Sequence, residues 1–347
     1  MRNLKRALSL ALAAIMLIGM MVVSASAASY NDLTDKDQIV NKDAVSMLVS
    51  LGIIEGKPDG SYGPTENVDR AQMAKMLSVI MNKGVDNSAL YQSVNSGLVD
   101  VNTNWAKGHI NYCYTTGIIA GRGNGKFDPS ATVTALEAAK MLLVAVGYDP
   151  KIEGLTGADW EINTNALASK LGIFRNLTAS VSEPLTRDNA ALLIYNALDV
   201  EMIQSYTTNN YPIVYSDHRT ILSDKYGVIK VEGVVTANEW AILDDDTDTA
   251  LQEGKTRIYN PDGILSTTGN TAVAQDSSAN VKTQVFNVST PVDMLGKAVT
   301  MYVKKTTILA DSTVYGAPVV SDVNTVIETG EKVTGGDSKD DDSLAAL

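Results

Sequence analysis

Residues 51–81 read LGIIEGKPDGSYGPTENVDRAQMAKMLSVIM, which combines a glycine-rich turn, a polar link containing Pro64, and a helix with a defined start. Asp69 is placed to be the N-cap, and Gln72 follows three residues later. This is the reciprocal arrangement that satisfies two backbone amides at a helix start. Apolar side chains then recur at helical spacing at Met73, Met76, Leu77 and Ile80. The pattern predicts a capped helix with one apolar face.

The same pattern returns twice along the chain. Residues 115–146 align with the first copy without a gap, and Thr134 and Glu137 take the places of the cap and its partner. A looser copy covers residues 171–198, in which Thr186 is the cap. The matching turn glycines are 65 and then 55 residues apart: Gly52, Gly117 and Gly172. Self-similarity of this kind indicates a repeat architecture.

Arginine occupies the first helical position in two copies, as Arg70 and Arg187, whereas the second copy has Ala135. A cation there opposes the positive end of the helix dipole, so capping alone does not explain it. Free amides at a helix start suit an anion, and a guanidinium adds a bidentate grip on a carboxylate. We therefore predict an anion site at Arg70 and a second at Arg187, beside the caps Asp69 and Thr186. The alternative is a purely structural role.

Three further residues are candidates for the same sites. Arg122 lies in the glycine-rich turn of the second copy, where it would replace the missing arginine; its alternative role is a solvated loop cation. Trp105 and Trp160 each lie 12 residues before a turn glycine. Because an indole can both pack in a core and stack on a sugar ring, two roles are open. We favour core packing for both tryptophans over sugar stacking.

These motifs resemble those of the S-layer homology (SLH) family. The resemblance covers residues 30–199 and is carried by LTD at 33–35 and LVD at 98–100, GIIEG at 52–56 and GIIAG at 117–121, and VDRAQ at 68–72 and LTRD at 185–188. It implies an all-α, pseudo-threefold unit that binds secondary cell-wall polysaccharide, typically carrying pyruvate ketals. Such a unit holds an exported protein on the cell envelope.

The chain divides into further parts on either side of the repeats. The first residues are basic, then apolar, and end in Ala-Ser-Ala, which predicts a cleaved export signal rather than a membrane anchor. Past Asp199 the pattern changes to short β-rich runs, which predict a small all-β barrel or sandwich. The predicted boundaries are 1–27 for the signal, 30–83, 97–149 and 155–199 for the repeats (the third divergent), 205–330 for the β domain and 331–347 for an acidic disordered tail. The predicted strands are 227–235, 239–243, 255–259, 283–288, 298–304 and 312–320.

Composition and motifs exclude several classes of protein. The formal charge of −12 argues against nucleic acid, whose binders present a basic face. Cys113 is the single cysteine, so we predict a buried small hydrophobe and neither a disulfide nor a zinc site. The acidic run at 244–248 lacks the spacing of a calcium loop, so we favour a solvated turn. No catalytic motif is present, and no cofactor is predicted.

Together these patterns predict a non-catalytic, secreted protein of the cell wall or surface layer. Its repeats would bind anionic secondary cell-wall polysaccharide, with no nucleic-acid partner and no membrane span after signal cleavage. Two alternatives stay open. The chain would otherwise be a wall-anchored hydrolase with its active site in the β domain, or a self-assembling lattice subunit that contacts other surface-layer proteins.

Overall fold

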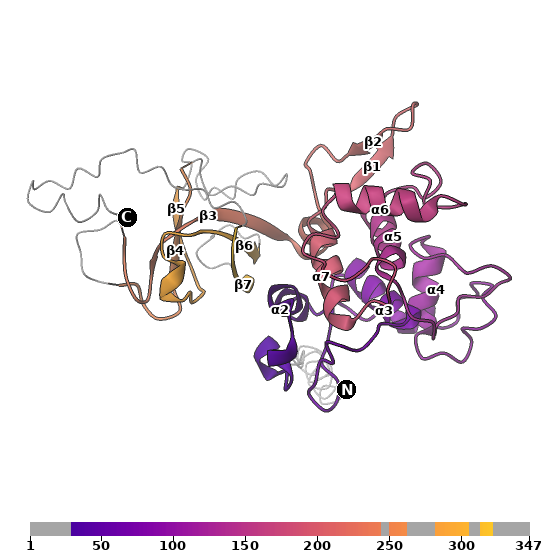
Figure 1. Cartoon of the computed structure of the whole chain (residues 1–347), viewed down its shortest axis with the longest axis horizontal. Helices are drawn as coiled ribbons and strands as arrows, with labels where there is room; N and C mark the ends of the chain where they lie inside the picture. The colour runs from indigo at the N-terminus through magenta and orange to yellow at the C-terminus, as the bar shows by residue number, and fades with distance from the viewer. Residues whose placement is uncertain (1–28, 244–249, 262–281, 305–312, 322–347) are drawn as a thin grey trace, which may run out of the picture.

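The structure is a computed structural model that describes residues 29–243, 250–261, 282–304 and 313–321. A helical N-terminal part is followed by an antiparallel β part, as expected for a multidomain chain (Figure 1). The predicted export signal, the acidic run at 244–248 and the predicted tail at 331–347 lie outside the described residues. Of the helices described, none is long and apolar enough to span a membrane.

The helical part consists of three helix pairs. Their first members are α2 (Lys42–Ser50), α4 (Lys107–Thr115) and α6 (Trp160–Lys170), and their second members are α3 (Arg70–Met81), α5 (Ala135–Val146) and α7 (Arg187–Leu198). Short 3-10 helices precede or join them: η1 (Tyr30–Asp32), η2 (Lys36–Gln38) and η3 (Ser88–Tyr91). The three predicted caps are confirmed, because the side chains of Asp69, Thr134 and Thr186 each accept a hydrogen bond from the amide three residues later. Helix α6 is mostly exposed, since only Thr164 and Ala168 of that helix are buried.

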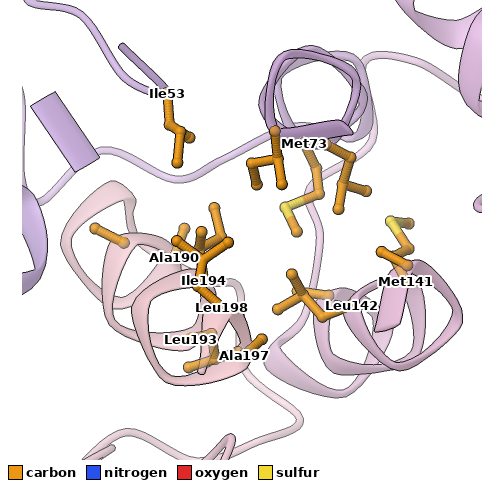
Figure 2. Packing of buried hydrophobic residues seen from close by; sticks show 14 of the residues in the cluster. Ile53, Met73, Met141, Leu142, Ala190, Leu193, Ile194, Ala197 and Leu198 are labelled. Carbon is orange, nitrogen blue, oxygen red and sulfur yellow. The ribbon is translucent and has the colours of Figure 1, made fainter. Parts of the chain in front are cut away.

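The three second helices enclose a common core. Figure 2 shows Met73 of α3, Leu142 of α5 and Ile194 of α7 turned toward the space between these helices. All three side chains are at most 1% exposed. Full burial of a side chain of this size stabilises a fold by about 1.5–3 kcal/mol. Cys113 of α4 belongs to the same core, as predicted, and burial raises the pKa of its thiol.

The links before the three second helices form a closed ring of backbone hydrogen bonds. The amide of Val68 donates to the carbonyl of Leu185 at 2.8 Å, and the amide of Val133 donates to the carbonyl of Val68 at 2.9 Å. The amide of Leu185 closes the ring on the carbonyl of Val133 at 2.7 Å. Each link therefore donates to one neighbour and accepts from the other, which fixes the three helix starts relative to one another.

In each of the first two helix pairs, an aspartate that precedes the first helix accepts hydrogen bonds from the turn that contains the aromatic residue. Asp35 accepts the amides of Tyr62 and Gly63 at 2.7 and 2.8 Å. Asp100 accepts those of Phe127 and Asp128 at 2.9 and 2.8 Å. Partial burial raises the pKa of both carboxyl groups. The hydrogen bonds from these amides have the larger combined effect and bring the pKa below its ordinary value, because they stabilise the charged form.

This geometry predicts a pH-dependent cost for Asp35→Asn and Asp100→Asn. Each change should lower the free energy of unfolding at pH 7 by about 1 kcal/mol, because an amide accepts these bonds more weakly than a carboxylate. A folded pKa below the unfolded value gives stability above the unfolded pKa, which is lost as the pH falls through the folded pKa. Urea unfolding of each variant and wild type should therefore differ at pH 7 and converge near pH 2. An equal difference at both pH values would contradict the assignment.

The β part begins with a hairpin that sequence patterns do not predict. Its strands are β1 (Ile203–Tyr206) and β2 (Pro212–Val214), and a π-helical turn η4 (Leu222–Tyr226) follows. The main sheet contains β3 (Val228–Asn238), β4 (Thr256–Tyr259), β5 (Thr283–Phe286), β6 (Ala298–Lys304) and β7 (Val314–Val320), with η5 (Val292–Met294) before β6. Its strand order is β5-β4-β3-β6-β7, and every neighbouring pair is antiparallel.

Two β-domain predictions differ from the structure. The predicted strand at 239–243 is a turn, because the side-chain oxygen of Asn238 accepts the amides of Trp240 and Ala241. Apart from the β1–β2 hairpin, the described strands form one open sheet with β5 and β7 at its edges, so the predicted barrel or sandwich is not seen among the described residues. The segments that link several of these strands lie outside the described residues. One face of the sheet carries its own apolar cluster, which includes Val231, Ile258 and Phe286.

Candidate functional site

Arg70 begins α3, but its side chain contacts the neighbouring helix pair. Its Nε donates to the carbonyl of Phe127 at 2.8 Å, and Nη2 donates to the carbonyl of Ala120 at 2.9 Å. The guanidinium carbon lies 4.4 Å from the centre of the Phe127 ring. The residue is 4% exposed. Arg70 therefore joins α3 to the turn that precedes α5, and part of its hydrogen-bonding capacity is structural.

The amides at the start of α3 are not free for a ligand. The amide of Arg70 donates to the carbonyl of Ala131, and that of Ala71 donates to the carbonyl of Pro129. The carboxylate of Asp69 accepts the amide of Gln72 at 2.7 Å. The prediction that free helix-start amides hold an anion is therefore wrong for α3, because carbonyls of the second helix pair already accept these bonds.

Arg187 repeats the arrangement at the start of α7. Its Nε donates to the carbonyl of Tyr62 at 2.7 Å, and Nη2 lies 3.5 Å from the carbonyl of Glu55. Its guanidinium carbon is 4.8 Å from the Tyr62 ring centre. The backbone amide of Arg187 donates to the carbonyl of Glu66, and the amide of Asn189 donates to the hydroxyl of Thr186. These amides at the start of α7 are therefore already hydrogen-bonded. Both arginines thus occupy equivalent positions against the aromatic turn of a neighbouring pair.

A groove of about 280 Å³ opens beside Arg70. We call it the Arg70 groove; it is lined by Arg70, the turn at 117–122, Glu137, Lys140, Met141, Val144, Pro150, Thr156 and Trp160. Three predicted site residues, Arg70, Arg122 and Trp160, therefore meet in one place. Five parts of the chain build it: the start of α3, the second glycine-rich turn, one face of α5, the link between α5 and α6, and the start of α6.

Positive charge dominates the Arg70 groove. Arg122 forms an ion pair with Glu137 at 2.7 Å, which offsets one cation. Lys140 lies over the Trp160 ring at 5.0 Å. Burial, and next the charge of Arg122, lower the pKa of Arg70 to about 10, so the guanidinium stays protonated at neutral pH. Among the described residues, no carboxylate lies within 4.0 Å of the Arg70 guanidinium. The groove therefore offers uncompensated cations on a chain of net charge −12.

Lys140 is a groove residue that the sequence analysis missed. It lies five residues after the first helical position, as does Lys75 in α3. Lys75 lies 3.7 Å from Glu55, in the turn that Arg187 contacts. The equal spacing of the two lysines from their helix starts can be read from the sequence. Lysine is common on exposed helix faces, however, so this spacing alone does not identify a binding residue.

The two tryptophans differ in burial. Trp105, just before α4, is 58% exposed, so the predicted core packing is wrong for this residue. Its ring meets that of His109 edge to face at 6.4 Å between centroids. Trp160 is half-buried at the start of α6. Helix α4, which follows Trp105, packs on α3, the helix that carries Lys75. Helix α6, which begins at Trp160, packs on α5, the helix that carries Lys140.

His109 is buried beside Trp105, and its ring lies close to a hydroxyl and a carboxylate. Its Nδ1 lies 2.6 Å from the hydroxyl of Ser78, and Nε2 lies 3.6 Å from Asp86. Burial lowers the pKa of His109, and the Asp86 carboxylate offsets part of this effect. Ser78 is 4% exposed and His109 is 3% exposed, so this serine is not accessible to a substrate.

We predict that acid weakens the fold through His109. Because its folded pKa lies below the unfolded value of about 6.5, the unfolded chain binds a proton first as the pH falls. The free energy of unfolding should therefore drop below pH 6.5, and His109→Gln should reduce this slope. The check is urea unfolding of both proteins from pH 7.5 to 5.0. Identical slopes for the two proteins would refute the prediction.

Metal chemistry finds no support among the described residues, where no group of three or more His, Cys, Asp or Glu side chains is arranged to hold an ion. His218, the second histidine, pairs with Glu201 at 2.9 Å in the β part. It lies in a different part of the fold from His109.

Comparison with known proteins finds a family match in the first two helix pairs. Residues 29–74 and 99–139 match the S-layer homology domain, whereas the third predicted repeat is not matched. A cell surface protein of Thermoanaerobacter kivui is 28% identical over 77% of this chain and 32% of its own length. An S-layer protein of Bacillus licheniformis is 34% identical over 33% of this chain and 12% of its own length.

Some similar proteins are hydrolases. The exoglucanase XynX of Acetivibrio thermocellus is 30% identical over 49% of this chain and 16% of its own length. The chain thus spans about a third or less of the length of these relatives. The S-layer homology match and the surface-layer relatives together give this chain a secreted, cell-wall-associated place at the cell surface.

Proposed function

We propose that this chain is a non-catalytic anchor that binds anionic secondary cell-wall polysaccharide through the Arg70 groove and the equivalent site at Arg187. The observation that carries this proposal is the repeated placement of Arg70 and Arg187. Each arginine donates Nε and Nη2 to two carbonyls of a neighbouring turn and lies over an aromatic ring. A lysine, Lys140 or Lys75, lies on the helix that follows that turn.

The ligand in this proposal is an acidic sugar. A carboxylate of a pyruvate ketal would accept hydrogen bonds from the guanidinium and from the lysine, since such charge-assisted bonds are stronger than neutral ones. The indole of Trp160 lies on the same groove and offers a flat apolar surface to a sugar ring. Trp105 has the corresponding position in the second site by register, and its exposure leaves its ring free to stack.

The third helix pair belongs to the same binding unit in this proposal, which makes the unit pseudo-threefold. The closed ring of hydrogen bonds among Val68, Val133 and Leu185 supports three equivalent links. The equivalent use of Arg70 and Arg187 supports it as well. Two weak sites on one rigid unit gain by avidity along a repeating polymer, because the second binding event is intramolecular.

Sedimentation with native wall sacculi tests this function. Wild-type protein should pellet with intact sacculi and stay in solution when the acidic polysaccharide has been extracted from them. Higher salt should reduce the pelleted fraction, since ionic contacts are screened. If the same fraction of protein pellets with extracted and with intact sacculi, the protein binds another wall component and the proposal is wrong.

A wall-anchored hydrolase is the second candidate, because an exoglucanase and an amylopullulanase are among the similar proteins. The matches cover only 16% and 10% of those two proteins. A matched portion this small is what a shared anchor would give. Glycan turnover by the purified chain would favour the hydrolase, and sheet formation without polymer would favour a lattice subunit with surface-layer partners.

A further inference from the structure

A third position equivalent to the two arginine sites exists between the second and third helix pairs, but its three ligand-type residues are replaced. By register, Ala135 stands where the other sites have Arg70 and Arg187. Leu192, five residues after Arg187, stands where they have lysine. Val40, 12 residues before Gly52, stands where they have tryptophan. No cation or indole of the first two sites is kept here.

The turn of this third position finds a different hydrogen-bond donor. Arg175 lies three residues after Gly172, as Ala120 lies three residues after Gly117, and at the first site the carbonyl of Ala120 accepts from Arg70. Here the side-chain amide of Asn196 donates to the carbonyl of Arg175 at 2.9 Å and to that of Ile173 at 3.1 Å. An amide within the third pair therefore replaces the arginine from its neighbour.

The β sheet forms the opposite wall of this third position. A cleft of about 520 Å³ is lined on one side by Val40, Arg175, Leu192 and Asn196, and on the other by Lys230, Glu232, Thr300, Tyr302 and residues 319–321. Figure 1 shows the sheet beside α2 and α7. Charges of both signs line the cleft, since Lys42, Arg175 and Lys230 accompany the carboxylates of Asp43 and Glu232. Of these cations, Lys230 is already paired with Asp199 and Glu232.

Specific contacts hold the sheet in this position. Lys230 Nζ lies 3.6 Å from Asp199 at the end of α7. The rings of Tyr195 on α7 and Tyr302 on β6 meet edge to face at 5.7 Å. Strand β7 packs on α2, where a Cβ at Gly316 would lie 3.6 Å from Met47. The sheet therefore packs on the helical unit through a partly buried ion pair, an aromatic pair and a close contact between β7 and α2.

We propose that the third position has become the docking site of the β sheet and does not bind the wall polymer. This proposal rests on the proposed function. It gives the helical unit two polymer sites instead of three, and it fixes the direction in which the sheet extends from the wall-binding surface. The replacements at Ala135, Leu192 and Val40 remove the anion contacts, while the Asp199–Lys230 pair and the tyrosines attach the sheet.

Amide hydrogen exchange of the full chain, with and without soluble wall polysaccharide, tests the number of sites. The polymer should slow exchange at residues 117–122 and 52–57 and leave residues 172–176 unchanged. Slower exchange at all three turns would overturn the proposal. If no turn is protected, the proposed function itself fails, whereas protection of only the first two turns supports both.

A second arm tests the docking contacts. The double variant Asp199→Asn/Lys230→Met removes both charges of the contact between the helical unit and the sheet. Glu232 also pairs with Lys230, but its side chain is 37% exposed, so its charge stays in contact with solvent. Exchange at residues 172–176 and 40–44 should become about tenfold faster, as local opening of this interface becomes easier, with no change at 117–122. Lys297→Ala, an exposed lysine of the sheet paired with Asp293, is the matched control and should alter neither region. Unchanged exchange at 172–176 in the double variant would overturn the proposal.

Discussion

Replacing Arg70 by alanine is expected to lower the free energy of unfolding by about 3 kcal/mol, because hydrogen bonds from a charged group contribute about 1.5–3 kcal/mol each and their loss leaves buried acceptors unsatisfied. The two carbonyls concerned belong to Ala120 and Phe127, and they lie 50 and 57 residues from Arg70 in the chain. The side chain therefore cross-links two helix pairs. Urea unfolding at pH 7 measures the effect.

Two matched variants define the result for Arg70. Arg187→Ala should cost less, because Arg187 is half-buried and its second hydrogen bond is 3.5 Å long. Arg219→Ala removes a more exposed arginine that pairs with Asp217 and Asp224, and it should change stability by no more than about 1 kcal/mol. A cost for Arg70→Ala no larger than that for Arg219→Ala would contradict the cross-linking role.

Removal of Lys140 from the Arg70 groove and of Lys75 from the site at Arg187 is expected to have the largest effect on binding. Lys75→Ala and Lys140→Ala should each weaken binding of wall polysaccharide about tenfold, the loss of one charge-assisted contact. The double variant should weaken it by about 100-fold or more, because avidity between the two sites is also lost. Neither lysine is needed for the core, so the stability of these variants should stay close to that of wild type.

This lysine experiment separates binding from folding in a way that the arginine variants cannot. Sedimentation with sacculi gives the affinities, and Lys297→Ala serves as the control for loss of one positive charge outside both sites. If the double variant binds as wild type does, the anion contacts lie elsewhere on the molecule.

Local sequence patterns predicted the helix starts well. Capping depends on residues three positions apart, so Asp69, Thr134 and Thr186 could be identified as caps without the fold. Five of the six main predicted strands are present within a few residues of their predicted bounds.

Contacts between repeats could not be predicted in the same way. The carbonyls that accept from Arg187 lie 125 and 132 residues away along the chain. Because the sequence does not show these acceptors, an arginine at the start of α7 suggested that an anion binds there. The exposure of Trp105 depends on how α4 lies on α3, which sequence spacing does not determine. The hairpin of β1 and β2 was missed because only Ile203 in these strands is buried, so no apolar alternation marks it.

The cationic Arg70 groove suggests a simple pH and salt behaviour for the anchor. The guanidinium of Arg70 has a pKa of about 10 and stays charged over the physiological range. The carboxylate of an acidic sugar, the ligand proposed above, would be ionised there as well, so binding should depend on salt far more than on pH between 6 and 8.

The most direct test is calorimetric titration of the full chain with short wall-polysaccharide fragments, before and after chemical removal of their acidic substituents. We expect two fragments to bind each chain when the acid groups are present, and no measurable heat when they have been removed. Equal binding of acidic and neutral fragments would contradict an anchor that recognises negative charge.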